Sequence, residues 1–487
     1  MNKKSISLLI HGGRVIDPSQ GIDRVADLLI VEGKIVHIRD AMTFSPTLST
    51  IPRKAQNLDA SGLIVCPGFV DIHCHLRQPG FEEKETIATG TRAAGRGGFT
   101  TVCCMPNTEP PLDTPDSLYW LKEKASQDGC VAVLPIGCVS RGRKGEELTD
   151  MVVLAKAGVV AFSDDGDPIA NSGLMRRALE YSRELGLPII DHCEDKTLSD
   201  NGVINEGVIS ARLGLKGVPA AAEEVMVARD LILANLTKAR LHIAHISTRG
   251  SVELIRRAKE QGVTVTAEAT PHHLTLTEER VIGKSSSRPF DTNAKVNPPL
   301  RTREDVKALI QGLKEGVIDA IATDHAPHTR ADKNCDLETA AFGISGLETA
   351  LGCLMDLVHQ GQITITQLIS KLTCGPARAI GRNGKLGALK VGAPADVTIV
   401  DPDREWVVDS RNFASKGKNT PYDGARFRGK VVATIANGAL VYVDNLLKNR
   451  FTPIAYYSKP TPCHFEAPSC HSEPPSCHSE PSEEPNV

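Results

Sequence analysis

The chain has 487 residues, of which 41% are hydrophobic and 24% are charged, and its formal net charge at pH 7 is −3. This balance lacks the clustered positive charge that nucleic acids and anionic membrane surfaces attract, so neither is expected as the main partner. No apolar run approaches the roughly 20 residues needed to cross a bilayer, and no export signal is recognisable, so we expect a cytoplasmic protein whose 13 cysteines stay reduced.

The first part of the chain has the sequence pattern of a small β domain. Short apolar stretches alternate with turns rich in Gly, Asp and Pro over residues 5–60, and the same pattern returns at residues 386–445. We predict that residues 1–61 and 386–458 form one small β-sandwich domain that is built from both ends of the chain.

From about residue 62 to 330 the sequence alternates eight short apolar runs with longer amphipathic segments, and we assign residues 62–385 to this domain. One such segment follows Thr114 and Pro115, a typical helix start, and stops at Gly129. Near-continuous apolar runs separated by helices indicate a parallel sheet that is covered on both faces. Eight strand and helix units in succession predict a (β/α)8 TIM-like barrel.

The polar residues of these runs gather at the carboxyl ends, which is the end of such a barrel that holds the active site. The first run closes with "DIHCHLRQPG" (residues 71–80), in which His73 and His75 stand two apart. Side chains two apart on a strand point the same way, so we expect both histidines to face the barrel axis. The further candidates at run ends are Asp164, Asp165, His192, His245 and Asp324. Strand parity alone does not decide between the two adjacent aspartates.

Imidazole and carboxylate groups that converge on one barrel mouth form a ligand set suited to zinc or another borderline divalent cation. A lone histidine is more often a packing residue, but several at matching strand ends predict a metal centre. The candidates exceed the four ligands of one tetrahedral ion, and two ions that share a ligand account for them most economically.

Eight short motifs follow one another along the chain. They are "DIHCHLRQPG" (71–80), "MPNT" (105–108), "AFSDDG" (161–166), "DHCE" (191–194), "AHIST" (244–248), "KVNPPLR" (295–301), "TDHAPH" (323–328) and "AFGISGLE" (341–348). In this order they resemble the cyclic amidohydrolase superfamily, and within it most closely the bacterial type I dihydroorotases. The resemblance covers about residues 5–445.

The resemblance implies a metal-dependent cyclic amide hydrolase with two zinc ions per subunit. The implied ligands are His73 and His75 on the first ion, His192 and His245 on the second, Asp165 as the bridge, and Asp324 on the first ion. Asp324 is also implied to be the catalytic residue that shuttles protons. Many relatives bridge with a carboxylated lysine instead, and "VVAFSDDG" (159–166) offers no lysine.

The implied substrate is dihydroorotate. Arg77, Asn107 and His328 are implied to hold its carboxylate, for which the guanidinium group of Arg77 has suitable donor geometry. The remaining implied substrate contacts are His75, Asn297, Asp324 and the backbone at Phe342 and Gly343. Hydantoin and dihydropyrimidine substrates lack this carboxylate, so their enzymes have less use for an arginine here.

The implied activity is reversible hydrolysis of (S)-dihydroorotate to N-carbamoyl-L-aspartate by a metal-bound hydroxide, a step of pyrimidine synthesis. One alternative is a hydantoinase, dihydropyrimidinase or allantoinase, which Arg77 and the missing lysine disfavour. Another is a non-catalytic partner of aspartate transcarbamoylase, which the complete ligand set disfavours. A homo-oligomer and a complex with the transcarbamoylase both remain open.

Several other segments are expected to lie outside the ligand set. His272 and His273 are interpreted as structural or supporting residues. His242 lies three residues before His245, so strand parity predicts that it packs outside the barrel. The polar stretch at 332–343 is expected to be a mobile loop over the mouth. Residues 459–487 are rich in proline and serine and are expected to be a disordered tail, in which repeated Cys-His pairs are interpreted as low complexity.

Overall fold

The computed structural model describes residues 5–40, 55–285 and 288–453. Its centre is an eight-stranded parallel sheet in which neighbours along the sheet follow the chain order. The strands are β6 (Phe69–Cys74), β7 (Phe99–Cys104), β8 (Ala132–Gly137), β9 (Ala161–Phe162), β10 (Ile189–Asp191), β13 (Leu241–Ile243), β14 (Val265–Ala269) and β17 (Ala320–Ile321). The last strand meets the first through a parallel bridge between Cys74 and His325, where the His75 amide donates to the His325 carbonyl at 2.9 Å. The predicted barrel is therefore confirmed.

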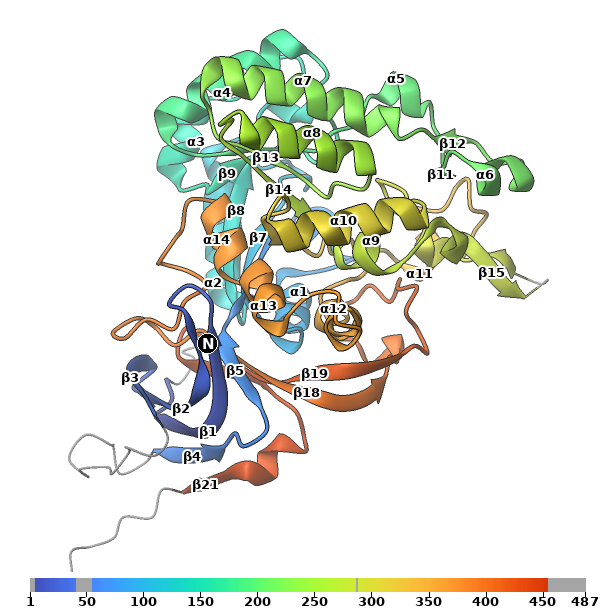
Figure 1. The fold of residues 1–487 in the computed structure, drawn as a ribbon. Helices are drawn as coiled ribbons and strands as arrows, with labels where there is room; N and C mark the ends of the chain where they lie inside the picture. Colours follow the sequence, from blue (N-terminus) through green and yellow to red (C-terminus); the bar gives the residue numbers. More distant parts are fainter. Residues whose placement is uncertain (1–4, 41–54, 286–287, 454–487) are drawn as a thin grey trace, which may run out of the picture. The chain divides into compact units, whose positions relative to one another are not determined.

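Helices cover the outside of this barrel (Figure 1). They are α1 (Ile87–Arg96), α2 (Pro115–Asp128), α3 (Met151–Ala157), α4 (Ser172–Leu185), α7 (Ala221–Thr237), α8 (Arg249–Glu260), α10 (Arg303–Glu315), α12 (Ala350–His359), α13 (Ile365–Leu372) and α14 (Cys374–Ala379). Helix α2 has its N-cap at Thr114, Pro115 in its first turn and its C-cap at Gly129, as the sequence predicts. Among the described residues, none of the helices has the length and apolar character that crossing a membrane requires.

Shorter elements lie on the connections that follow the barrel strands. They are α5 (Lys196–Ser199), β11 (Ile204–Asn205), α6 (Val208–Leu213), β12 (Gly217–Val218), α9 (Pro271–Thr275), β15 (Ile282–Ser285), β16 (Arg288–Phe290) and α11 (Arg330–Lys333), with single-turn 3₁₀ helices at 141–143, 278–281 and 292–294. Two further 3₁₀ helices, at 410–412 and 447–450, lie outside the barrel.

Adjacent strand residues face two different apolar layers. On β10, Ile189 packs with residues of the covering helices such as Leu179, while its neighbour Ile190 packs inside the barrel with Ile136 and Ala320. Both layers consist of buried residues, so strands such as β10 are apolar on both faces, as expected for a parallel barrel.

Strands from both ends of the chain form a separate nine-stranded sheet. They are β1 (Leu8–Asp17), β2 (Ile22–Val31), β3 (Lys34–Asp40), β4 (Gln56–Asp59), β5 (Ile64–Pro67), β18 (Val397–Val407), β19 (Arg426–Ala436), β20 (Ala439–Val443) and β21 (Phe451–Pro453). The two ends join where β5 pairs with β18, with Val65 opposite Ile399. The first half of β1 pairs with β4 and the second half with β5, so the sheet branches there around its own apolar core. A β domain made from both chain ends is confirmed, and the predicted tail at 459–487 lies outside the described residues.

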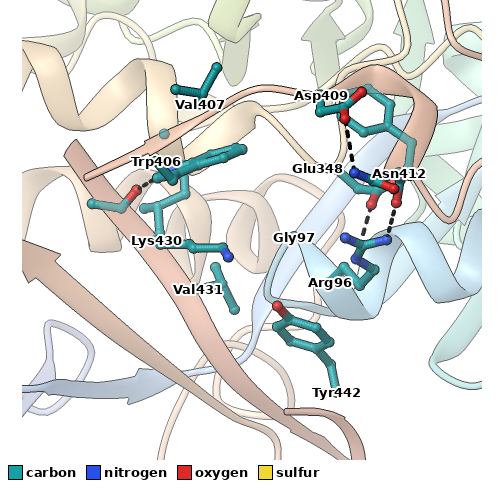
Figure 2. Close-up of a pocket in the computed structure, with 14 residues that line it drawn as sticks. Arg96, Gly97, Glu348, Trp406, Val407, Asp409, Asn412, Lys430, Val431 and Tyr442 are labelled. Carbon is teal, nitrogen blue, oxygen red and sulfur yellow. Dashed lines mark hydrogen bonds and ion pairs between the residues drawn. The ribbon is translucent and has the colours of Figure 1, made fainter. Parts of the chain in front are cut away.

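A cavity of about 190 Å³ lies where β18, β19 and β20 meet the covering helices α1 and α12 (Figure 2). Arg96 at the end of α1 pairs with Glu348, with 3.2 Å between Nε and Oε2. The indole Nε1 of Trp406 donates to the Gly429 carbonyl at 3.0 Å. These polar groups already have protein partners, and the cavity contains none of the predicted site residues.

Candidate active site

The six predicted ligands come together at the carboxyl ends of the barrel strands, and all six are buried. They are His73 on β6, His75 just after it, and Asp165, His192, His245 and Asp324, which follow β9, β10, β13 and β17. His245 and Asp324 adopt positive φ values of 28° and 45°, which are uncommon for residues other than glycine. Such conformations often occur at functional sites, where surrounding structure holds them.

One oxygen of Asp165 belongs to a first group of donor atoms. Asp165 Oδ2 lies 3.4 Å from His73 Nε2 and 3.5 Å from His75 Nε2. Asp324 Oδ1 lies 3.1 Å from His75 Nε2 and 3.6 Å from His73 Nε2. Ligands at about 2.0–2.1 Å around a tetrahedral zinc ion are themselves roughly 3.3 Å apart, so these four atoms have the spacing of one cation's ligands.

The other oxygen of Asp165 belongs to a second group. Asp165 Oδ1 lies 3.6 Å from His192 Nδ1 and 3.4 Å from His245 Nε2, and these two ring nitrogens are 2.9 Å apart. Asp164, which sequence parity left as an alternative, instead accepts hydrogen bonds from the amides of Val139 and Ser140 at 2.9 and 3.1 Å.

Two of these buried ligand atoms have no hydrogen-bond partner, namely His73 Nε2 and Asp165 Oδ1. A buried polar atom without a partner is rare because it loses its contact with water. One such atom belongs to each donor group, and a cation in each would satisfy both. The residues therefore fit a binuclear metal site.

The charges of the cluster favour ionised carboxylates. Burial alone would raise the pKa of Asp165, but the charge of His73 and the neighbouring imidazoles of His192 and His245 hold it well below its usual range. Burial likewise opposes ionisation of Asp324, but the hydrogen bond with His75 and the charge of His73 keep its pKa low. Negative oxygens between imidazoles are suited to divalent cations.

Glu268 on β14 supports this cluster and is not among the site residues predicted from the sequence. Its Oε1 accepts a hydrogen bond from His73 Nδ1 at 2.7 Å, and its Oε2 contacts His242 Nε2 at 3.0 Å. A carboxylate behind a ligating histidine fixes which ring nitrogen is free for the metal. The sequence signal for it was a single glutamate inside the apolar run at 265–269.

The prediction that His242 packs outside the barrel is wrong. His242 is buried and reaches Glu268, which in turn contacts His73 in the centre of the barrel. The prediction carried strand alternation through to His245, but β13 ends at Ile243 and the backbone turns at His245. Alternation therefore cannot relate these two histidines.

Glu194 connects the second donor group to the neighbouring polar residues. Its Oε2 lies 3.1 Å from His192 Nε2 and accepts a hydrogen bond from Asn297 Nδ2 at 3.0 Å. Burial opposes ionisation, but the contact with His192 lowers the pKa of Glu194 to about 2. One carboxylate thus orients both a candidate ligand and a candidate substrate contact.

A cavity of about 240 Å³ opens above the two donor groups. All the predicted substrate contacts line it, namely His75, Arg77, Asn107, Asn297, Asp324, His328, Phe342 and Gly343. Asn107 Oδ1 accepts a hydrogen bond from His75 Nδ1 at 2.9 Å. His272 and His273 are buried but do not line this cavity, and His273 contacts Thr270 and the Pro298 carbonyl.

Arg77 stands at this cavity without an acidic partner. Its Nε donates to the Pro327 carbonyl at 3.3 Å, and its Nη2 lies 3.3 Å from His328 Nε2. Within the described ranges, no carboxylate forms an ion pair with its guanidinium group. Burial and the charge of Arg77 lower the pKa of His328 to about 3, so this ring is neutral at pH 7. The floor of the cavity thus consists of residues suited to bind metal ions, and its wall carries the guanidinium group of Arg77 without an acidic partner in the described chain.

Comparison with known proteins gives consistent results along the chain. A family model described as dihydro-orotase-like matches residues 62–251, and an amidohydrolase family model matches residues 211–442. A protein named dihydroorotase from Caldanaerobacter subterraneus subsp. tengcongensis is 54% identical over 440 residues, which cover 90% of this chain and 98% of that protein. A dihydroorotase from Pelotomaculum thermopropionicum is 52% identical over 448 residues, 91% of this chain and 100% of that protein.

Solved structures with similar folds come from related hydrolases. The L-hydantoinase (dihydropyrimidinase) from Arthrobacter aurescens has a TM-score of 0.79 and 27% identity, covering 90% of this chain and 96% of its own. The dihydropyrimidinase from Brevibacillus agri NCHU1002 has a TM-score of 0.77 and 23% identity, covering 90% of this chain and 95% of its own. At that identity the second likeness bears on the fold alone.

Proposed function

The chain belongs to the dihydroorotase family of metal-dependent amidohydrolases, and from this premise we propose that it interconverts (S)-dihydroorotate and N-carbamoyl-L-aspartate in pyrimidine synthesis. The observation that carries the proposal is the position of Arg77 on the wall of the cavity whose floor is formed by the two donor groups. Buried free thiols such as those of Cys66, Cys104 and Cys193 support a cytoplasmic location.

The histidine and carboxylate donors are suited to zinc. Two zinc ions would activate a water molecule for attack and polarise the ring carbonyl. The first would be held by His73, His75, Asp165 and Asp324, and the second by Asp165, His192 and His245.

Asp324 performs the proton transfers. Its ionised carboxylate lies at the floor of the cavity, where it accepts a proton from the attacking water and returns it to the departing ring nitrogen. The reverse reaction uses the same carboxylate, which takes the proton from the carbamoyl nitrogen as the ring closes.

Arg77 selects the substrate. Its planar group of N–H donors matches a carboxylate, and it has no acidic partner in the described chain that would compete. Asn107 and the neutral ring of His328 lie beside it on the same cavity wall. Asn297 and the backbone at Phe342 and Gly343, which also line the cavity, contact the ring of the substrate.

We expect the Arg77→Ala variant to raise KM for dihydroorotate by about 10- to 100-fold, because a hydrogen bond to a charged group contributes about 1.5–3 kcal/mol. Bound metal should stay at the wild-type level, since Arg77 is not one of the donors. Initial-rate kinetics and metal analysis on the same sample measure both. Arg176→Ala is the matched control, because Arg176 pairs with Glu180 on the exposed side of α4 and lies outside the cavity lining. An unchanged KM in Arg77→Ala would remove the arginine from the carboxylate site.

The activity itself is tested with a panel of cyclic amides. The wild-type protein, with its metal content measured, is assayed for ring opening of dihydroorotate, dihydrouracil, hydantoin and allantoin. We expect kcat/KM for dihydroorotate to exceed that of the three others by at least about 100-fold, because only dihydroorotate places a carboxylate on Arg77. Preference for another ring would indicate a different cyclic amidohydrolase. Absence of all four activities with metal bound would indicate a non-catalytic partner.

A further inference from the structure

Two buried lysines lie behind the wall of the active-site cavity. Lys295 is 2% exposed and belongs to the segment 292–297, which carries Asn297. Lys333 is 6% exposed and ends the short helix α11 in the segment 330–343, which carries Phe342 and Gly343. Neither lysine is among the residues predicted from the sequence to form the site.

Each ammonium group bonds to two main-chain carbonyls of the opposite segment, and that of Lys333 also bonds to one carbonyl of its own segment. Lys333 Nζ donates to the carbonyls of Thr292 and Lys295, both at 3.1 Å, and to that of Ala341 at 2.6 Å. Lys295 Nζ donates to the carbonyls of Leu337 and Glu338 at 2.7 and 2.9 Å. It also lies 4.3 Å from the centre of the Phe342 ring, within the range of a cation–π contact. We refer to Lys295 and Lys333 together as the lysine brace.

The lysine brace buries two positive charges, and burying a charge costs free energy. In the part of the chain that the structure describes, neither ammonium forms an ion pair with a carboxylate, although buried charges are usually paired. Burial lowers the pKa of Lys295 to about 8, and burial together with nearby Lys295 lowers that of Lys333 to about 7. Three carbonyls around Lys333 require three N–H donors, which only the protonated amine has. The free-energy cost of burying two ammonium groups indicates that the relative position of the two segments is important for the function of the site.

The braced backbone continues directly into the substrate cavity. The Gly343 amide donates to the Lys295 carbonyl at 3.0 Å, and the Gly343 carbonyl accepts from Asn419 Nδ2 at 3.0 Å. The Phe342 carbonyl accepts from His328 Nε2 at 2.8 Å. A Cβ on Gly343 would lie 2.7 Å from Ala326, so the backbone passes too close for any side chain. The peptide at 342–343 is therefore fixed from both sides.

We propose that Lys295 and Lys333 are positioning residues for the substrate, because they hold segment 330–343 against segment 292–297 and so set the backbone at Phe342–Gly343 and the side chain of Asn297. This inference rests on the proposed function for the identity of the substrate. The segment that the sequence led us to expect as a mobile loop is thus fastened at several carbonyls. Neither lysine contacts a metal-ligand candidate, so the brace acts on binding of the ring rather than on proton transfer.

The first test is the Lys333→Met variant, which keeps the length and apolar stem of the side chain but removes all three donors. We expect KM for dihydroorotate to rise about tenfold or more, kcat to stay within about twofold, and metal content to stay unchanged. Lys371→Met is the matched control. Lys371 is half-buried, donates to the Ile318 carbonyl and has a pKa lowered by burial to about 8, but Ile318 precedes β17 at the opposite end of the barrel. The control should lose some stability and keep its KM.

A second set of variants tests whether the effect passes through the backbone. Lys295→Met should show the same division between KM and kcat as Lys333→Met, and it serves alone if the latter does not fold. Gly343→Ala should raise KM by shifting the same peptide. The double variant Lys333→Met/Gly343→Ala should then raise KM by clearly less than the product of the single effects, because both changes act on one element.

Hydrogen exchange gives a readout that needs no substrate. The amides of Thr339, Ala340 and Ala341, which bond within the segment, should exchange faster in Lys333→Met than in the wild type or in Lys371→Met. Faster exchange in a protein that does not open dihydroorotate would reject the proposed substrate and retain the brace. Unchanged KM in both brace variants, with kinetics like those of Lys371→Met, would reduce the lysines to a purely structural role and overturn the inference.

Discussion

Asp324→Asn is expected to lower kcat by about 10²- to 10⁴-fold in both directions of the reaction, the range that a positioned proton-transfer group contributes. Asparagine has the same size and one equivalent oxygen, so the contact with His75 Nε2, now 3.1 Å from Asp324 Oδ1, can be kept. Its amide cannot accept and return a proton at neutral pH. Initial-rate assays of ring opening and ring closure, with metal content determined in parallel, measure the effect.

The control for this variant is Asp167→Asn. Asp167 lies two residues after Asp165, but its side chain is 42% exposed and pairs with Arg143 and Lys196. Its loss should change kcat by less than about twofold, because exposed ion pairs contribute little. If Asp324→Asn kept a tenth of the wild-type kcat with metal bound, another group would have to carry the proton.

Asp165→Asn is expected to reduce bound metal from two ions per chain to one or fewer and to lower kcat/KM by more than about 10³-fold. Asp165 contributes Oδ2 to the first donor group and Oδ1 to the second. Asparagine retains one acceptor oxygen and no charge, so it cannot serve both groups. Even residues that only support ligands typically change metal affinity 10- to 100-fold, and loss of a shared ligand should exceed this. Metal analysis after dialysis measures the stoichiometry.

Asp164→Asn is the control for Asp165→Asn. It removes a buried negative charge next to Asp165 without removing a proposed metal ligand. Asp164 is equally buried, but its oxygens accept from the amides of Val139 and Ser140. This variant should unfold at a lower temperature and still bind two ions. Two ions in Asp165→Asn, or their loss only in Asp164→Asn, would contradict the assignment of the bridge.

The sequence was sufficient to predict the barrel because local pattern and global fold agree there. Each apolar run in residues 62–330 became a strand, and the signals at Thr114, Pro115 and Gly129 mark the observed ends of α2. His73 and His75 could be placed together because His73 lies on β6 and His75 follows it directly, with its amide still bonded in the parallel bridge to His325. Nearly all of the information needed for these elements lies within a few neighbouring residues.

The alternation of side chains along a strand predicted fewer side-chain directions where the strands are short. Strand β9 spans only Ala161–Phe162, so parity could not choose between the two aspartates that follow. Beyond the end of β13, the turn at His245 made the parity argument for His242 wrong. The sequence rule applies only as far as the extended backbone continues.

Residues that act through distant partners could not be found from local pattern. Glu268 bonds to His73, which lies 195 positions away, and Lys333 bonds to carbonyls 38 and 41 positions away. Main-chain carbonyls carry no residue-type signature, so the role of Lys333 is absent from any motif. A single charged residue in an apolar strand, such as Glu268, is the one local signal that could have suggested a buried ionic contact.

The pairing of β5 with β18 bears on how the polypeptide can be completed during synthesis. Strand β5 runs almost directly into β6, which supplies His73, yet its antiparallel partner is more than 300 residues further along. Until that partner has been translated, one edge of β5 has open hydrogen-bonding groups, which are a template for aggregation. The entropy of closing so long a loop also makes this a late step in folding. The nascent chain is therefore prone to aggregate at this edge until the segment that forms β18 has been synthesised.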